Sequence, residues 1–386
     1  MNAKALRIGV EAISAGNGFG VAAGGMVVYY DGLLGALARS SGVESLITFV
    51  PPWVEEIGIP EVPKIRHVTC HALSRKRGAR VLYEQLVLPL RAARQRPDVL
   101  LSTHNVVPLL WQGPSVVVVQ SIQYRFFPEI YGHLRRAYLT TFVGASIRRA
   151  DAVIAVSEWA KEQIITLFNI DPARVFAVHH GISTRVSGAA NRNGSHAHAS
   201  TKRPYIVMVS TLYRFKNHAR LIEAFANVVH EYAVPHELVI AGGDADTTIF
   251  ELQRVASRCG IADRVRFMGP VHHDEIPQLV AGANVVVYPS LMETFGHPIV
   301  EALALGRCVL TSNRGAMKEI AGDAARLVDP TDVEDMSAGL ADLILDDSLR
   351  ERLARQGRLR AGEFTWERCA VGTLRALRYA VARRSG

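Results

Sequence analysis

The chain has 386 residues, of which 49% are hydrophobic and 21% are charged, a balance typical of a globular protein with two domains or one large one. Its four cysteines lie far apart without a CxxC spacing, which argues against a disulfide framework and favours thiols in a reducing compartment. The N-terminal segment is too short and too mixed for a signal peptide, and no apolar run approaches the ~20 residues of a membrane span, so we expect a cytoplasmic protein.

The net charge of +8 is concentrated in the first half of the chain. Residues 1–190 carry 20 Lys or Arg against 13 Asp or Glu, whereas residues 191–386 carry 24 against 23. A basic surface of this kind attracts phosphates or anionic lipid head groups; the alternative is a solvated surface that keeps the protein soluble. No aromatic stacking pattern accompanies the basic residues, so we expect no nucleic-acid binding.

The first half alternates strands with helices. The segment LRIGVEAIS predicts a first strand, and GGMVVYYDGLLGALARS predicts a helix with apolar side chains on one side. The short apolar runs SLITFV, DVLLST, SVVVVQS and DAVIAVS follow, and each is typical of a buried parallel strand. This alternation indicates a doubly wound, Rossmann-like α/β domain over residues 1–183.

The second half repeats the pattern after a polar linker at residues 184–204. A second Rossmann-like domain is expected over residues 205–364, with strands at YIVMVST, ELVIAGG, RVRFMG, ANVVVYPS and CVLTSN and a helix capped by Asn217. Residues 365–386 predict a last, amphipathic and basic helix. Parallel sheets bind ligands outside the carboxyl ends of their strands, and two domains that face each other form a cleft in which sites tend to lie.

Two glutamates lie eight positions apart in PSLMETFGHPIVEALALG, residues 289–306. The helix in this segment is expected to start at Pro298, which places Glu293 on a loop at the carboxyl edge of the sheet and Glu301 in the first turn of the helix. Gly296 allows close backbone approach, and the helix N-terminus suits a phosphate. A carboxylate beside that phosphate accepts hydrogen bonds from the diol of a ribose or a hexose. Taken singly, the two acids are also explained as a favourable charge at a helix start and a solvated loop residue.

A second loop of the same domain carries two cations, Arg214 and Lys216, just before another helix. Because both loops open on the same edge of the sheet, a lysine there can neutralise a diphosphate leaving group. The alternative for Lys216 alone is a surface lysine. Neither Glu293 nor Glu301 has a His or Cys partner at a suitable spacing, so we expect no metal site.

These residues resemble the large family of retaining glycosyltransferases with the GT-B fold that use nucleotide-sugars. The acid–seven–acid pattern is that family's signature, and the match extends over almost the whole chain through RVRFMGPV, EIAGDAARLVDP, RVLYEQLVLP, AVIAVSEWAKEQI, HHGI and FTWERCA. The resemblance implies that Glu301 holds the nucleotide ribose, that Glu293 contacts the transferred sugar in catalysis, and that Lys216 pairs with the diphosphate. It also implies that the last helix packs back on the N-terminal domain. Further nucleotide-sugar contacts are expected from Ser210, Thr211, Arg214, Val271, Thr294, Phe295 and Gly296.

The chain departs from the family pattern in three places. Ser210 and Thr211 stand where the family often has Gly-Arg, so one phosphate-binding arginine is absent and Arg214 is its candidate substitute. Gln120 stands where a histidine commonly lies near the sugar, and its amide can still donate or accept a hydrogen bond in catalysis. The acceptor loop resembles AGNGFGVAAGGM, with Gly24 and Gly25 at the start of a helix.

The resemblance is strongest to bacterial mannosyl- and rhamnosyltransferases that build surface polysaccharides. It implies a GDP-sugar donor, GDP-mannose or a close relative, with UDP-sugars as the alternative. It also implies a glycan or lipid-linked acceptor and no cofactor or metal. Residues 75–96 mix arginine with leucine and valine, so they could contact the inner face of an anionic membrane; a packed helix with snorkelling arginines explains them equally well.

Two other classes of protein are alternatives to this hypothesis. A non-catalytic nucleotide- or sugar-binding scaffold would account for the missing Gly-Arg and His-Asp features. An NAD-dependent oxidoreductase would account for GNGFG after the first strand, but the glycine spacing is wrong and the second strand lacks an acid at its end for a ribose.

Overall fold

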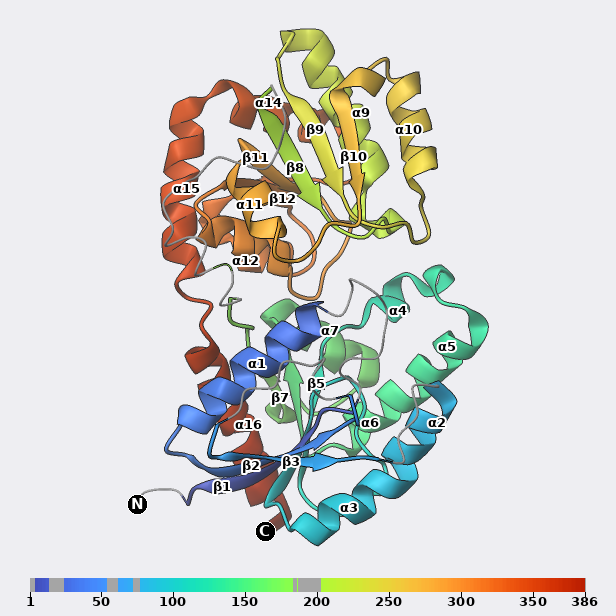
Figure 1. Ribbon diagram of the computed structural model, residues 1–386, viewed down its shortest axis with the longest axis vertical. Coiled ribbons are helices and arrows are strands. Elements are labelled where there is room, and N and C mark those ends of the chain that lie inside the picture. Colours follow the sequence, from blue (N-terminus) through green and yellow to red (C-terminus); the bar gives the residue numbers. More distant parts are fainter. Residues whose placement is uncertain are drawn as a thin grey trace. The chain divides into compact units, whose positions relative to one another are not determined.

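The computed structural model describes residues 4–13, 24–53, 62–71, 77–182, 186 and 203–385. The chain divides into two compact units, the first formed by Met1–Gly181 with Thr365–Gly386 and the second by Ile182–Phe364 (Figure 1). Of the predicted linker 184–204, only 186, 203 and 204 lie within the described residues.

The first unit is built on a parallel sheet that has seven strands within the described residues, in the order β3-β2-β1-β4-β5-β6-β7. The order reverses at β1, which pairs with both β2 and β4, as a doubly wound sheet requires. The strands are short, and the inner strands β4, β5 and β6 are fully buried, which matches their apolar sequences. Their bounds are β1 Leu6–Glu11, β2 Val43–Val50, β3 Ile65–Thr69, β4 Val99–Ser102, β5 Ser115–Val119, β6 Ala152–Ala155 and β7 Val175–Ala177.

Helices cover both faces of this sheet. Two longer helical runs contain a π-helical turn, at Tyr83–Val87 between α2 and α3 and at Leu139–Val143 between α5 and α6. The α-helices are α1 Gly24–Arg39, α2 Arg77–Leu82, α3 Leu88–Gln95, α4 Gln123–Phe126, α5 His133–Tyr138, α6 Gly144–Arg149, α7 Glu158–Phe168 and α16 Trp366–Ser385.

The C-terminal helix α16 lies beside α1, 327 residues away in the sequence at their nearest ends (Figure 1). Trp366 fills the space left by two glycines, because a Cβ on Gly32 would lie 2.1 Å from its ring and a Cβ on Gly181 would lie 2.6 Å from it. At the other end of the helix, Arg384 Nε donates to Asp151 Oδ1 over 2.9 Å. Shape and charge together therefore attach α16 to the first unit.

The second unit has a parallel sheet with six strands within the described residues, in the order β10-β9-β8-β11-β12-β13. Its strands are β8 Tyr205–Val209, β9 Glu237–Ala241, β10 Val265–Gly269, β11 Val285–Tyr288, β12 Cys308–Ser312 and β13 Arg326–Val328. The order reverses between β8 and β11, so the loops that follow these two strands meet at the carboxyl edge of the sheet.

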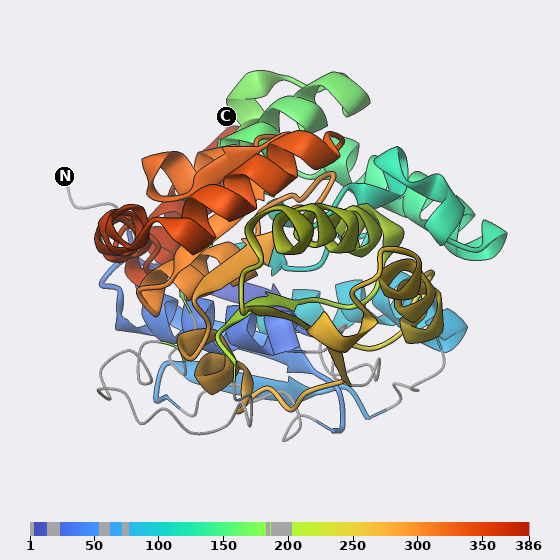
Figure 2. The same cartoon turned by 90° about the horizontal axis from the view of Figure 1, so that it is seen from above.

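Helices also cover both faces of the second sheet, and α9 packs against α14 (Figure 2). The α-helices are α9 His218–Tyr232, α10 Ile249–Arg258, α11 Ile276–Ala281, α12 His297–Ala304, α13 Met317–Ala321, α14 Val333–Leu345 and α15 Asp347–Ala361. The prediction that Asn217 caps α9 is wrong: Asn217 occupies the N-cap position, but its side chain makes no capping hydrogen bond.

Three strands, β3, β7 and β13, were not predicted from the sequence. All three lie at sheet edges, and most of their residues are only half-buried. An edge strand buries less of its surface than a central one, so its sequence lacks the continuous apolar run that marks β5 or β11.

Candidate active site

The loops after β8 and β11 meet through a buried ion pair. Lys216 ends a short 3-10 turn, Arg214–Lys216, between β8 and α9, and Glu293 lies on the loop between β11 and α12. The Lys216 ammonium donates to Glu293 Oε1 and to the Tyr288 hydroxyl, each over 2.5 Å. The side chains of Lys216 and Glu293 are only 13% and 8% exposed. Glu293 is therefore not the solvated loop residue of the alternative explanation.

The surroundings of Lys216 keep it charged. Burial by itself lowers the pKa of the ammonium, but the Glu293 carboxylate and the Tyr288 oxygen outweigh burial and raise this pKa above its ordinary value. The ammonium also lies 4.8 Å from the centroid of the Tyr288 ring, close enough for a cation–π contact. Lys216 therefore stays protonated at the carboxyl edge of the sheet, in an ion pair that is neutral as a whole.

Glu301 lies one turn into α12. The helix begins at His297, one residue before the predicted start at Pro298, and its first turn contains no acidic residue. The prediction that Glu301 lies in the first turn is therefore wrong by one residue. The carboxyl group is half-buried, and burial raises its pKa to about 7. A favourable charge at a helix start does not explain a carboxyl group in this position.

The residues between the two acids shape the start of α12. Gly296 has φ 107°, a left-handed conformation that favours glycine. Thr294 and Phe295 are buried, and the Phe295 ring contacts the rings of His297 and Phe364 at centroid distances of 4.9 and 5.9 Å. Burial lowers the pKa of His297 to about 4, so its ring is neutral near pH 7.

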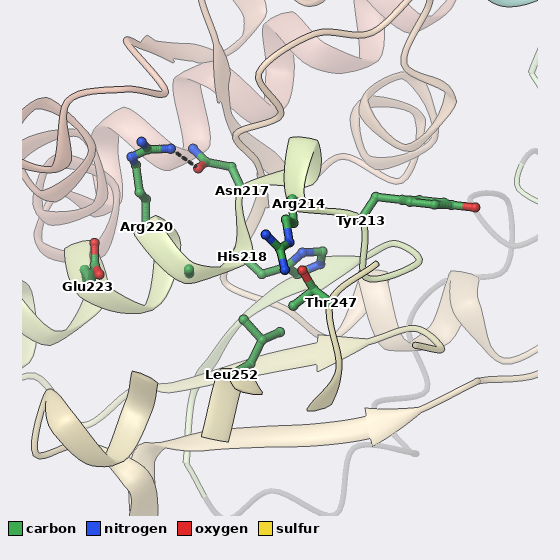
Figure 3. Close-up of a pocket in the computed structure, with 9 residues that line it drawn as sticks. Tyr213, Arg214, Asn217, His218, Arg220, Glu223, Thr247 and Leu252 are labelled. Atoms are coloured by element: carbon green, nitrogen blue, oxygen red, sulfur yellow. Dashed lines mark hydrogen bonds between the residues drawn. The ribbon is translucent and has the colours of Figure 1, made fainter. Parts of the chain in front are cut away.

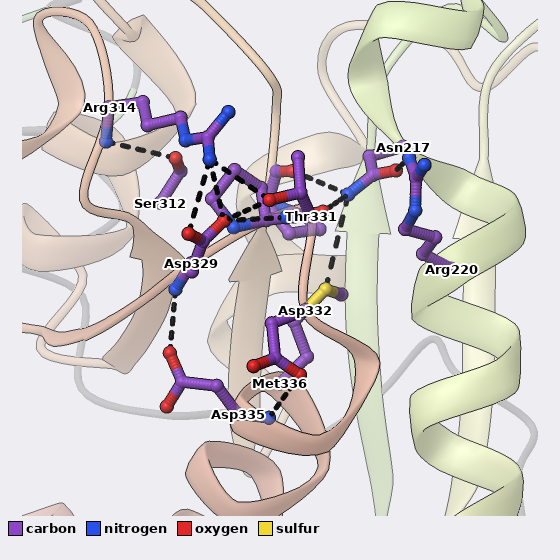
Figure 4. Close-up of polar contacts among 11 residues, drawn as sticks. Asn217, Arg220, Ser312, Arg314, Asp329, Thr331, Asp332, Asp335 and Met336 are labelled. Carbon is purple, nitrogen blue, oxygen red and sulfur yellow. Dashed lines mark hydrogen bonds and ion pairs between the residues drawn. The ribbon is translucent and has the colours of Figure 1, made fainter.

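A third loop, between β12 and α13, contacts the backbone of Glu293. Ala316 N donates to Glu293 O over 3.1 Å, and a Cβ on Gly315 would lie 3.0 Å from that same oxygen. Arg314 from this loop binds both carboxylate oxygens of Asp329, at 3.0 and 3.1 Å (Figure 4). The sequence reasoning missed this loop, although Gly315 was a signal for a close backbone approach.

Ser210 and Thr211 directly follow β8, the strand that precedes Lys216. Ser210 Oγ lies 2.9 Å from His218 Nε2, and a Cβ on Gly242 would lie 1.8 Å from Ser210 O. The chain therefore has no room for a side chain on Gly242, at the end of β9. Val271 follows β10 and is half-buried, which places it at the same edge of the sheet.

Arg214 makes its hydrogen bonds to Asp246, on the loop after β9. Its backbone N donates to Asp246 Oδ1 over 2.8 Å, and its Nε donates to Asp246 O over 3.2 Å. Together with His218 and Thr247 it lines a pocket of 390 Å³, of which Lys216 is not a lining residue (Figure 3). The structure thus brings Glu293, Lys216 and Tyr288 into contact, but not Arg214.

The first unit carries the remaining predicted residues. Gly24 and Gly25 begin α1, while residues 15–23 of the predicted acceptor loop lie outside the described residues. Gln120 is half-buried, with its backbone N donating to Asn105 Oδ1 over 2.7 Å and its Nε2 donating to Thr103 O over 3.2 Å.

Two buried acids in the first unit were not predicted. Glu11 ends β1 and Glu84 lies in the π-helical turn after α2, and both are almost inaccessible to solvent. Burial, and then the charge of Glu11, raise the pKa of Glu84. Glu11 Oε1 accepts a hydrogen bond from Ile13 N over 2.7 Å. The sequence signal was an acid at the end of the first apolar strand.

No cluster of three or more His, Cys, Asp or Glu side chains that could hold a metal ion occurs in the described parts of the chain. Within the same residues, no helix is long and apolar enough to cross a membrane.

Two sequence families match the chain, one for each half. Glycosyltransferase Family 4 matches residues 23–186, and Glycosyl transferases group 1 matches residues 193–360. The chain belongs to the GT-B glycosyltransferases. Neither family supports the alternative of an NAD-dependent oxidoreductase.

Individual relatives of this GT-B protein include two bacterial mannosyltransferases. It is 30% identical over 254 residues to the O-antigen chain mannosyltransferase B of Escherichia coli, covering 64% of this chain and 66% of that one. It is 32% identical over 245 residues to the MMP alpha-(1->4)-mannosyltransferase of Mycolicibacterium hassiacum, covering 61% and 56%. The matches thus span less than two thirds of the length of these relatives.

Solved structures share the fold of the GT-B protein. The structure of HepE from Anabaena, in complex with UDP and glucose, superposes with a TM-score of 0.67 at 18% identity, covering 97% of this chain and 99% of that one. At 18% identity, this structural similarity shows a common fold and nothing about function.

Proposed function

We propose that this protein is a retaining hexosyltransferase that moves mannose, or a related sugar, from a GDP-sugar to a glycan or lipid-linked acceptor in surface polysaccharide synthesis. The observation that carries the proposal is the 2.5 Å contact of Lys216 with Glu293 at the carboxyl edge of the second sheet, with Glu301 on the helix that follows. The two relatives named as mannosyltransferases support the choice of sugar.

Each group of the site has a role in this proposal. The Glu301 carboxylate accepts hydrogen bonds from the two ribose hydroxyls. The diphosphate lies at the start of α12, where the helix dipole attracts it, and Lys216 neutralises its charge. The Glu293 carboxylate then faces the transferred sugar, where it accepts hydrogen bonds from the sugar hydroxyls.

Retention follows from attack on the face that the diphosphate leaves. The acceptor oxygen forms a bond to the anomeric carbon while the bond from that carbon to the phosphate oxygen breaks, and the acceptor proton passes to the departing phosphate oxygen. Catalysis by the protein consists of positioning and electrostatic stabilisation of the diphosphate by Lys216 and α12. The proposal therefore includes neither a metal nor a cofactor.

A ligand series followed by a transfer assay tests this function. We expect GDP to raise the melting temperature by mass action, and GDP-mannose to give an α-linked product that NMR identifies. If only UDP raises the melting temperature, the proposed donor changes from a GDP-sugar to a UDP-sugar. Binding of a nucleotide without turnover of any donor sugar would favour a non-catalytic scaffold, and a product of inverted configuration would overturn the proposed stereochemistry.

The acceptor of the proposed reaction brings the protein to an anionic membrane surface. The helical run from α2 to α3 exposes Leu82, Leu86 and Leu90, which are 61%, 53% and 64% exposed. Their spacing of four residues places them on one side of the run. Arg94 is exposed on the same run, and a cation beside exposed leucines is suited to anionic head groups.

Co-sedimentation with vesicles tests this surface. We expect binding to vesicles of phosphatidylglycerol, little binding to phosphatidylcholine, and loss of binding in Leu86→Asp. The matched control is Leu359→Asp, because Leu359 is 78% exposed on α15 of the second unit. If the wild type and Leu86→Asp bind the vesicles equally, this helical run is not the surface that contacts the membrane.

A further inference from the structure

Asn217, directly after Lys216, is a buried residue with an unusual backbone. Its φ is 73°, in the left-handed region, and it is 3% exposed. Its Nδ2 donates to Pro330 O over 2.6 Å and to Pro289 O over 3.2 Å, while its Oδ1 accepts from Arg220 Nη1 over 3.0 Å (Figure 4). The amide is thus bonded at both ends, and none of these bonds caps α9.

The bond to Pro289 joins the loop of Lys216 to the segment of its partners. Pro289 directly follows Tyr288, whose hydroxyl accepts from Lys216, and Glu293 lies four residues further along. A backbone bond, from Leu291 N to Phe215 O over 2.7 Å, runs beside the amide contact. Both connections flank Lys216 in the sequence, at positions 215 and 217, so they fix the backbone from which its side chain extends.

The bond to Pro330 joins the same loop to the turn between β13 and α14. That turn is held in place by Thr331, whose N and Oγ1 donate to Asp329 Oδ1 over 2.8 and 2.6 Å. Arg314 binds both Asp329 and Thr331 and belongs to the loop that supports Glu293 through Ala316. Four loops at the sheet edge are therefore joined in a closed ring of hydrogen bonds, of which Figure 4 shows the part around Asn217, Arg314 and Asp329.

We propose that Asn217 is a positioning residue that holds the Lys216 ammonium in place at the donor site. Asparagine meets two demands at once: it tolerates a left-handed backbone, and its amide donates two hydrogen bonds. Glycine meets the first demand without the second, and aspartate offers a carboxylate that cannot donate to Pro289 O or Pro330 O. The position of Lys216 is thus set by three loops, not by the Lys216 loop alone.

The consequence for catalysis rests on the proposed function. A catalytic charge that is displaced by about 1 Å costs up to about 100-fold in rate. We therefore expect Asn217→Gly to lower the turnover number for sugar transfer by about 10- to 100-fold while the protein stays folded. Asn169→Gly is the matched control, because Asn169 also has a left-handed backbone, with φ 49°, but is exposed at the end of α7.

The position of Lys216 is measured without any substrate by acetylating the folded protein with dilute N-hydroxysuccinimide acetate, followed by peptide mass spectrometry. We expect slow acetylation of Lys216 in the wild type and in Asn169→Gly, and acetylation at least about tenfold faster in Asn217→Gly, because the freed ammonium becomes accessible. Lys64, which donates to Ser40 O and Val43 O, is the unchanged internal reference. Equal protection of Lys216 in wild type and folded Asn217→Gly would overturn the proposal.

If Asn217→Gly does not fold, Asn217→Asp replaces it, because its carboxylate cannot donate to Pro289 O or Pro330 O; the same comparison of Lys216 acetylation then decides. The transfer assay is repeated on a Lys216→Ala background. A positioning role predicts that Asn217→Gly has no further effect there, whereas a purely structural role predicts the same loss on both backgrounds and contradicts the proposal. Loss of Lys216 protection without any loss of transfer would instead refute the proposed function of Lys216.

Discussion

Lys216 Nζ and Glu293 Oε1 lie 2.5 Å apart although the two residues are separated by 77 positions in the sequence. Both side chains are largely buried. A buried charge that loses its partner is costly, whereas replacing both members of a pair is much less so. The contact therefore serves stability as well as the proposed binding of a diphosphate.

The double substitution Lys216→Met/Glu293→Gln is expected to be more stable than Lys216→Met alone. The single variant leaves the Glu293 carboxylate without its ammonium and should lose about 3 kcal/mol of unfolding free energy, as measured by urea denaturation. Sugar transfer should be severely reduced in both variants. Strictly additive stability losses would show that the two side chains are not energetically coupled.

Glu301→Gln is expected to stabilise the ligand-free protein at pH 8 but not at pH 4. The folded-state pKa of about 7 lies above the ordinary value of 4.5, so folding favours the protonated form. Below pH 4.5 the Glu301 carboxyl is protonated in both the folded and the unfolded protein, so it does not lower the unfolding free energy of the wild type. As the pH rises through 7, the half-buried group ionises and the wild type loses stability relative to Glu301→Gln. We expect a difference of roughly 2 kcal/mol at pH 8. The urea midpoints of the wild type and of Glu301→Gln at pH 8 and pH 4 measure this difference. If the difference between the two proteins is the same at both pH values, the burial of the Glu301 carboxyl is contradicted.

The affinity for GDP is expected to fall as the pH drops below 7. The ribose hydroxyls bind the ionised Glu301 carboxylate, so binding must release the proton that the free protein holds below its pKa of about 7. The limit of this effect is about tenfold per pH unit. Calorimetry from pH 5.5 to 8 measures it. The Glu301→Gln variant should bind GDP more weakly, and its pH dependence should reflect the titration of the GDP phosphate alone. Identical pH profiles of the wild type and the variant would show that the Glu301 carboxylate does not bind the ribose.

Gly242→Ala is expected to destabilise the second unit. Its Cβ would lie 1.8 Å from Ser210 O and would push the end of β8, which leads to Lys216, out of place. We expect a loss of about 2–3 kcal/mol, the upper range for overpacking. Gly243→Ala is the control, because its Cβ would meet nothing nearer than the Pro270 ring at 3.4 Å. Equal melting temperatures of the two variants would contradict the close approach seen between β8 and β9.

The residues alone were sufficient to predict much of this protein. The continuous apolar runs of central strands such as β5 and β11 predicted two parallel sheets, because a strand buried on both faces has little choice of side chain. The Glu293 and Glu301 spacing, with Gly296 and Pro298 between them, predicted a loop followed by a helix at the carboxyl edge. These features depend on local backbone preferences, which act over a few residues.

The tertiary structure decided what the local sequence does not determine. Arg214 and Lys216 are two residues apart and were both expected at the phosphates, yet Lys216 contacts Glu293 and Arg214 binds the Asp246 loop. Asn217 looked like a helix cap, but its amide bonds to carbonyl groups 72 and 113 positions away. Such contacts depend on how strands far apart in sequence are ordered in a sheet. A side chain with several local options takes the one that buries its polar atoms with partners.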